Sequence, residues 1–242
     1  MTREEMFQDI ESITVGLDDT FKFHCTQCGK CCRHREDILL SPFDIFKMAK
    51  ELGLAPAEFF AKYCRSHIGD NSRIPIVRLN SVGNDGHCPL LRNNKCSVHK
   101  VKPAVCAMFP LGRYIAVNQD DAEKTSLDGK SVKYLLQDPE CGDVSETHTV
   151  RDWLADFDIN TEDEVFIRWN ATLLEVGQVV RKLEKTENMM TMFLLWNALR
   201  IGLYLDYDTK QDFLPQLEKN ANKCIAMLHD IRKKKGMGNH AG

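Results

Sequence analysis

The chain has 242 residues, of which 43% are hydrophobic and 28% are charged, a composition typical of a globular protein with one large domain or two small ones. Its formal net charge of −3 gives no basic field that would attract nucleic acid or an anionic membrane, so we expect neither as a partner. The polar N-terminus lacks the apolar core of a signal peptide, and the most apolar segment, 189–205, is too short to cross a bilayer. We therefore expect a cytoplasmic protein.

Short elements are expected in the first part of the chain. Ser41 is followed by a proline and, three residues on, by Asp44, which predicts a capped helix that ends at Gly53. A second short helix is predicted over 56–63. Residues 80–112 are expected to be irregular. Strands are predicted over 73–79, 113–117 and 131–136, the last two joined by a polar turn over 120–129.

Long helices are expected from residue 149 onward. A capping box at 161–164 predicts a helix that continues to about residue 185. Two further helices are predicted over 189–205 and 210–235, the second with Pro215 in its first turn.

These elements predict an α+β fold. A small mixed region with few short strands, rich in cysteine and expected to bind metal, covers residues 20–148. A helical region over 149–235 follows it. We expect the two regions to pack as one compact unit.

Four of the ten cysteines lie within eight residues, as Cys25-x2-Cys28-x2-Cys31 followed directly by Cys32. Cytosolic thiols are kept reduced, so such a cluster indicates metal binding rather than disulfides. The run matches the first three positions of the bacterial ferredoxin motif, but Arg35 occupies the fourth, so a remote ligand must complete the site. In an extended backbone Cys31 and Cys32 would point to opposite sides, so either one is spare or they serve two centres.

The remote ligands are expected from a second group of cysteines. Their spacings of seven and nine intervening residues fit loops that return to a common point, and one further cysteine follows. The lone Cys64 and Cys224 lie on predicted helices and are expected to be buried packing residues. The complete set of candidate metal ligands is Cys25, Cys28, Cys31, Cys32, Cys88, Cys96, Cys106 and Cys141.

Charge supports the same interpretation. The windows 22–35 and 86–113 together hold nine basic residues and no acid, in a chain with more acids than bases. Cations near thiols lower thiol pKa values and offset the negative charge of a thiolate centre. The alternative is a solvated basic surface or a modest site for an acidic partner.

The cysteine motifs resemble those of the CxxCxxCC family, the YkgJ-type cysteine-cluster proteins. The resemblance covers about residues 20–145, and it implies a zinc- or iron-chelating domain. The family also includes flagellin lysine N-methylases, which implies methyl transfer as one activity. His99 stands where the family often has tyrosine and leaves open an extra nitrogen ligand. The motifs are Cys25-x2-Cys28-x2-Cys31-Cys32, Cys88-Pro89-x-Leu91, Cys96-x-Val98 and Pro103-x2-Cys106-x2-Phe109-Pro110.

Three functions follow as hypotheses. The ferredoxin-like run favours an iron-sulfur or iron centre with a redox or catalytic role. A closed thiolate site would instead hold zinc and make the domain a structural or interaction module. The third hypothesis is a protein-lysine N-methyltransferase like the flagellin enzymes. The sequence identifies no catalytic acid, base or nucleophile, and it leaves a protein partner or substrate open.

Overall fold

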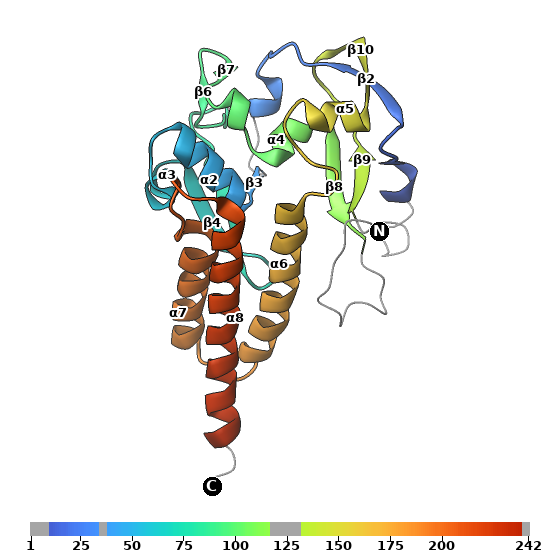
Figure 1. Ribbon diagram of the computed structural model, residues 1–242. Helices are drawn as coiled ribbons and strands as arrows, with labels where there is room; N and C mark the ends of the chain where they lie inside the picture. Colours follow the sequence, from blue (N-terminus) through green and yellow to red (C-terminus); the bar gives the residue numbers. More distant parts are fainter. Residues whose placement is uncertain (1–9, 34–37, 117–131, 239–242) are drawn as a thin grey trace. The chain divides into compact units, whose positions relative to one another are not determined.

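The computed structural model describes residues 10–33, 38–116 and 132–238. It has the predicted α+β architecture, with short antiparallel strands in small sheets and long helices in the C-terminal part (Figure 1). Within the described part of the chain, no helix combines the length and the apolar character that a membrane crossing needs. The predicted polar turn over 120–129 lies outside the described residues.

The chain divides into two compact units, each built from two separate stretches of sequence. Unit 1 comprises 1–38 and 81–167, and unit 2 comprises 39–80 and 168–242. The division expected from the sequence placed 39–80 with the cysteine-rich region. In the structure residues 39–80 belong to the same unit as the C-terminal helices, because the two helices and the sheet of this stretch pack against those helices in one hydrophobic core.

Unit 1 consists of small antiparallel sheets around an aromatic core. Trp153 stands in the centre of this core, stacks edge-on against Phe21 and Phe23, and donates its indole N–H to the carbonyl of Met108 over 3.0 Å. The three-stranded sheet has the order β1 (Thr14–Val15), β9 (Val132–Leu136), β8 (Leu111–Ile115), and β2 (Thr20–His24) pairs with β10 (Asp143–Thr149), which leads into α5 (Val150–Ala155).

Unit 2 packs a three-stranded sheet against helices. The predicted capping box of α2 is present, since the Asp44 N–H donates to the Ser41 hydroxyl over 3.1 Å and the Asp44 carboxylate accepts from the Ser41 N–H over 2.9 Å. Gly53 follows the helix in a left-handed conformation, as predicted. The sheet has the order β3 (Leu39–Leu40), β5 (Pro75–Leu79), β4 (Cys64–Ile68), and the helices before β4 are α2 (Pro42–Glu51) and α3 (Pro56–Tyr63).

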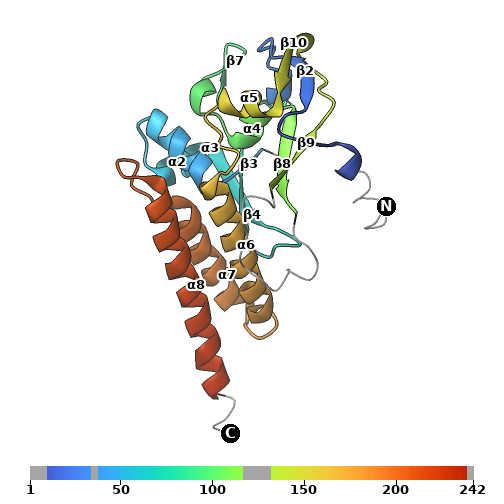
Figure 2. The same ribbon diagram turned by 45° about the vertical axis from the view of Figure 1, so that its right-hand side comes forward.

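Three long helices complete unit 2 and run side by side in both views (Figures 1 and 2). The first begins later than predicted, because Asp163 is its cap and accepts a hydrogen bond from the Phe166 N–H over 3.0 Å. The second does not continue regularly but widens into a π-helical segment around Gly202. The helices are α6 (Glu164–Leu183), which starts in unit 1, α7 (Met189–Arg200) with η5 (Ile201–Leu205), and α8 (Phe213–Gly238).

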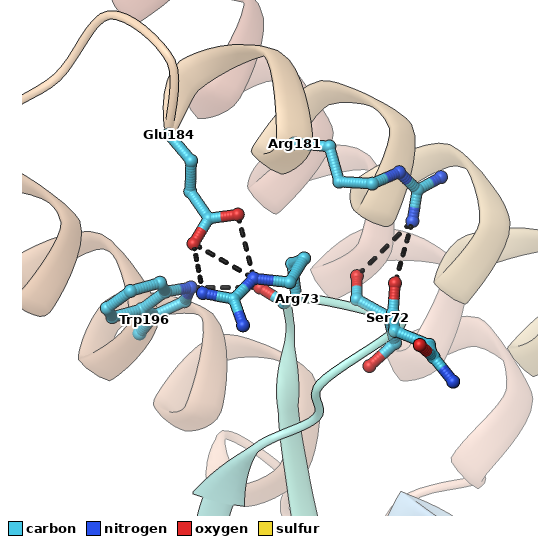
Figure 3. A network of polar contacts seen from close by, with 6 residues as sticks. Ser72, Arg73, Arg181, Glu184 and Trp196 are labelled. Carbon is cyan, nitrogen blue, oxygen red and sulfur yellow. Dashed lines mark hydrogen bonds and ion pairs between the residues drawn. The ribbon is translucent and has the colours of Figure 1, made fainter.

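A polar network fixes the β4–β5 turn to these helices (Figure 3). Arg73 forms an ion pair with Glu184 at the end of α6 over 2.6 Å, and its carbonyl accepts the indole N–H of Trp196 from α7 over 2.9 Å. The predicted strand over 73–79 therefore starts only at Pro75, since Arg73 takes a left-handed turn conformation.

Candidate metal centre

The first cysteine group forms a tight turn directly after β2. Gly29, with a φ of 72°, starts the 3-10 turn η1 (Lys30–Cys32). The backbone at Cys31 and Cys32 is therefore helical and not extended, and neighbouring side chains in a 3-10 turn do not point to opposite sides as they do in a strand. Their two sulfur atoms lie 4.0 Å apart.

The second group starts at Cys88 and continues through a small hairpin. Its two strands are β6 (Leu91–Arg92) and β7 (Lys95–Cys96), paired so that Leu91 faces Cys96. Asn93 and Asn94 between them both have positive φ, the conformation that a two-residue hairpin turn requires. The sequence predicted only irregular structure here.

Cys106 lies in a helix that the sequence did not predict. After the 3-10 turn η2 (His99–Val101), Pro103 leads into α4 (Ala104–Met108). The N–H groups of Cys106 and Ala107 both donate to the Pro103 carbonyl. This short helix directs Cys106 into partly buried surroundings, where burial raises the pKa of its thiol.

The two cysteine groups meet in unit 1. The backbone N–H of Cys88 donates to the carbonyl of Cys32 over 2.8 Å. Arg33 donates to the side chain of Asn94 in the hairpin turn over 2.6 Å. Gly29 also lies against this hairpin, since a Cβ at this position would be 3.5 Å from the Asn94 carbonyl. Segments separated by more than fifty residues in sequence are thus side by side in space.

Strand pairing brings Cys141 to the same place. β10 pairs with β2 so that Asp143 faces His24, which puts the residues before β10 beside the cysteine turn. Gly142 has a φ of 78°, and its backbone passes so close that a Cβ would lie 2.5 Å from the His24 carbonyl. The Lys30 ammonium donates to the Glu140 carbonyl over 2.6 Å and ties the turn to this segment.

One local geometry recurs at three of the candidate ligands. The sulfur atoms of Cys28, Cys88 and Cys96 each accept a hydrogen bond from the backbone N–H two residues further along, at Lys30, Leu90 and Val98. Hydrogen bonds of this kind favour the thiolate over the thiol and tune metal-bound sulfur.

The balance of burial and hydrogen bonding differs among these sulfurs. Cys28 is exposed, and the Lys30 N–H lowers the pKa of its thiol. Cys88 and Cys96 are partly buried, and burial raises the pKa of both thiols despite the N–H donors. Burial also raises the pKa of Cys141 to about 11.

The thiols also act on one another. The hydrogen bond with Cys31 raises the pKa of Cys32 most, and burial raises it further. The like charges of Cys31, Cys88 and Cys106 act in the same direction. A bound metal cation would offset this repulsion between the thiolates. Within the described ranges, no three His, Cys, Asp or Glu side chains are already close enough to form a coordination sphere. The sulfurs are thus neighbours without a closed site.

The neighbouring bases act in two ways. Arg92 and Lys102 lower the pKa of nearby thiols, Arg92 at Cys88 and Lys102 at Cys96. This agrees with the compensation that the sequence predicts. Arg113, in contrast, forms an ion pair with Asp163 over 2.8 Å and belongs to the packing of unit 1. Arg35 lies outside the described residues.

Asp85 lies between the two cysteine groups, and the sequence analysis missed it. Its carboxylate forms an ion pair with Arg33 and contacts the His87 ring nitrogen over 2.6 Å. Arg33 directly follows Cys32 in sequence, and His87 directly precedes Cys88. An acid in the turn Gly83-Asn84-Asp85-Gly86, three residues before a cysteine, was the available signal.

His99, Cys64 and Cys224 are the remaining residues that the sequence analysis considered. His99 lies edge-on to the Phe157 ring, and burial followed by the Lys102 charge lowers its pKa. Its role as an extra ligand stays a prediction. Cys64 and Cys224 are buried, as expected, although Cys64 begins β4 instead of lying within a helix.

The donor set fits a zinc or iron centre. Thiolate is the ligand that zinc and iron-sulfur clusters share, and eight candidate thiols gather in one unit with N–H donors directed at several of them. The fold and these thiols define a cysteine-rich chelating domain.

Comparison with known proteins also points to a cysteine-rich chelating domain. Residues 24–142, just under half of the chain, match the model of the CxxCxxCC family, described as "Putative zinc- or iron-chelating domain". The uncharacterized protein MJ0661 of Methanocaldococcus jannaschii is 31% identical over 90 residues, which are 36% of this chain and 44% of that relative. The match thus spans less than half of the relative's length. No solved structure matches the chain significantly.

Proposed function

We propose that unit 1 is a metal-binding domain that holds an iron-sulfur or iron centre through its clustered thiolates and serves a redox or catalytic role. The observation that carries this proposal is the convergence of the ferredoxin-like run with a remote cysteine. The run supplies Cys25, Cys28 and Cys31, and a cluster of this type needs a fourth cysteine ligand. The β2–β10 pairing brings Cys141 beside Cys25, so Cys141 is the candidate for that ligand.

Zinc is the second candidate, and a different observation favours it. Cys88 and Cys96 are partly buried, flank a short hairpin and each accept backbone N–H groups. Closed thiolate sites on such short loops are typical of structural zinc. In that case the domain is a structural or interaction module without redox chemistry.

Anaerobic purification of the full chain tests the two candidates. We expect a brown protein that contains iron and acid-labile sulfide and that loses its visible absorption when dithionite is added. Metal content is measured by elemental analysis on the same sample. A colourless protein with stoichiometric zinc would contradict the iron proposal and support the zinc module, and a metal-free protein that takes up neither metal would refute both.

A further inference from the structure

Eight candidate thiols are more than one centre uses, since a tetrahedral zinc ion or a single iron-sulfur cluster takes four protein ligands. We propose that unit 1 holds two adjacent metal centres. The inference rests on the proposed function and specifies how the ligands are divided. The outer centre uses Cys25, Cys28, Cys31 and Cys141, and the inner centre uses Cys32, Cys88, Cys96 and Cys106.

Backbone geometry defines the outer group. Cys25 follows the last residue of β2, and Cys141 stands two residues before β10, so the Asp143–His24 pairing brings the two cysteines together. The Cys28 sulfur accepts a hydrogen bond from the backbone N–H of Gly142, the residue after Cys141, and it also forms a hydrogen bond with the Cys141 thiol. These contacts connect the outer cysteines directly.

A separate set of contacts defines the inner group. Cys32 accepts the N–H of Cys88 through its carbonyl over 2.8 Å. The hairpin pairs Cys96 with Leu91, three residues after Cys88. The thiols of Cys88 and Cys96 are both electrostatic neighbours of Cys106 in α4.

The division runs between Cys31 and Cys32. Their sulfurs are 4.0 Å apart, and Cys31 is an electrostatic neighbour of Cys141 as well as of Cys96 and Cys106. Cys31 therefore stands where the groups adjoin. Its spacing from Cys28 completes the ferredoxin-like run, which gives each group four thiols. The 3-10 turn thus supplies one ligand to each centre.

The two groups also differ in exposure. Two outer cysteines, Cys25 and Cys28, are exposed, whereas Cys31, Cys141 and all four inner cysteines are partly buried. A chelator reaches an exposed thiolate centre before one enclosed by hairpin and helix. We therefore expect the outer centre to lose its metal first.

Titration of the full-length, reduced chain with Zn(II) tests this division. Native mass spectrometry counts the bound zinc, and we expect two ions per chain. Double substitution C25S/C28S should leave one ion, and C88S/C106S should also leave one. Cys224→Ser, which changes a buried cysteine in α8 outside both groups, should retain two. A single zinc in the unaltered chain, or loss of both ions in either double variant, would overturn the proposal.

Alkylation provides a measurement that needs no variant. The zinc-loaded chain is treated with a chelator in steps and labelled with iodoacetamide, and labelled cysteines are identified by peptide mass. We expect the four outer cysteines to become labelled before the four inner ones. Simultaneous labelling of all eight would refute two centres but leave a single-centre domain, whereas a chain that never takes up zinc or iron refutes metal binding itself.

Discussion

Asp85 connects the two cysteine groups at the level of single side chains. It holds Arg33, which follows Cys32, and His87, which precedes Cys88. Residues that orient metal ligands typically contribute 10–100-fold to metal affinity. We therefore expect Asp85→Asn to weaken zinc binding by roughly 10–100-fold, because Arg33 and His87 lose their common partner. Competition with a chromophoric chelator measures this affinity.

The matched control for this substitution is Asp230→Asn, which changes an exposed acid on α8 outside unit 1. It removes the same charge without touching the cysteine groups, so zinc affinity should stay at the value of the unaltered chain. If both variants bind zinc equally well, Asp85 has no positioning role.

The pairing of β2 with β10 positions Cys141 at the level of elements, and Gly142 makes that pairing possible. A Cβ there would lie 2.5 Å from the His24 carbonyl and 2.6 Å from the Phe23 ring, and the backbone has a φ of 78°. We expect Gly142→Ala to separate the two strands locally and to lower zinc affinity about tenfold or more. Zinc titration checks the affinity, and thermal unfolding checks the stability of unit 1.

Gly53→Ala separates conformational strain from this clash. Gly53 has a φ of 65°, but a Cβ there would meet nothing within 4 Å. Its substitution should cost about 1 kcal/mol of stability, from the left-handed conformation alone. Zinc affinity should not change. An equal effect of the two substitutions on zinc binding would show that strand approach at Gly142 is unimportant.

Elements whose signals are local could be predicted from the sequence, and those that depend on distant partners could not. The α2 helix was predicted correctly because Ser41, Asp44 and Gly53 specify its two ends. Strands β2 and β10 were both missed, because they pair across more than a hundred residues and the register of the pairing shifts within β10. Helix α4 was missed because five residues contain too little periodicity for a pattern.

The same distinction applies to the candidate site. Cysteine chemistry predicted that the segments around residues 28 and 88 meet, and the structure places them side by side. The turn at Cys31 and Cys32 was not predicted, since no side-chain cap marks η1 and only the left-handed Gly29 starts it. The spacing of Asp85 from Cys88 could have drawn attention to this residue, but its contacts with Arg33 and His87 depend on tertiary structure.

At the scale of the whole molecule, the candidate ligands all belong to unit 1, while unit 2 has its own hydrophobic core. Metal binding contributes directly to the stability of small thiolate domains. We expect removal of the metal by a chelator to unfold unit 1 and to leave most helical structure of unit 2 intact, because α7 and α8 contain none of the candidate metal ligands. Far-ultraviolet circular dichroism should therefore retain most of its helical signal after metal removal.

Hydrogen exchange locates the effect of this treatment along the chain. Protection should be lost in β2, β8 and β10 and retained in α7 and α8. Cooperative loss of protection in both units at the same chelator concentration would contradict independent stability of unit 2.

The interleaved order of the two units has a consequence for biosynthesis. Residues 39–80 separate the first four cysteines from Cys88, so these thiols leave the ribosome well before their partners exist. Cys141 emerges later still. The nascent chain therefore carries these four thiols before Cys88 and Cys141 are synthesised, and a centre that uses all of them would be completed only when β10 is made.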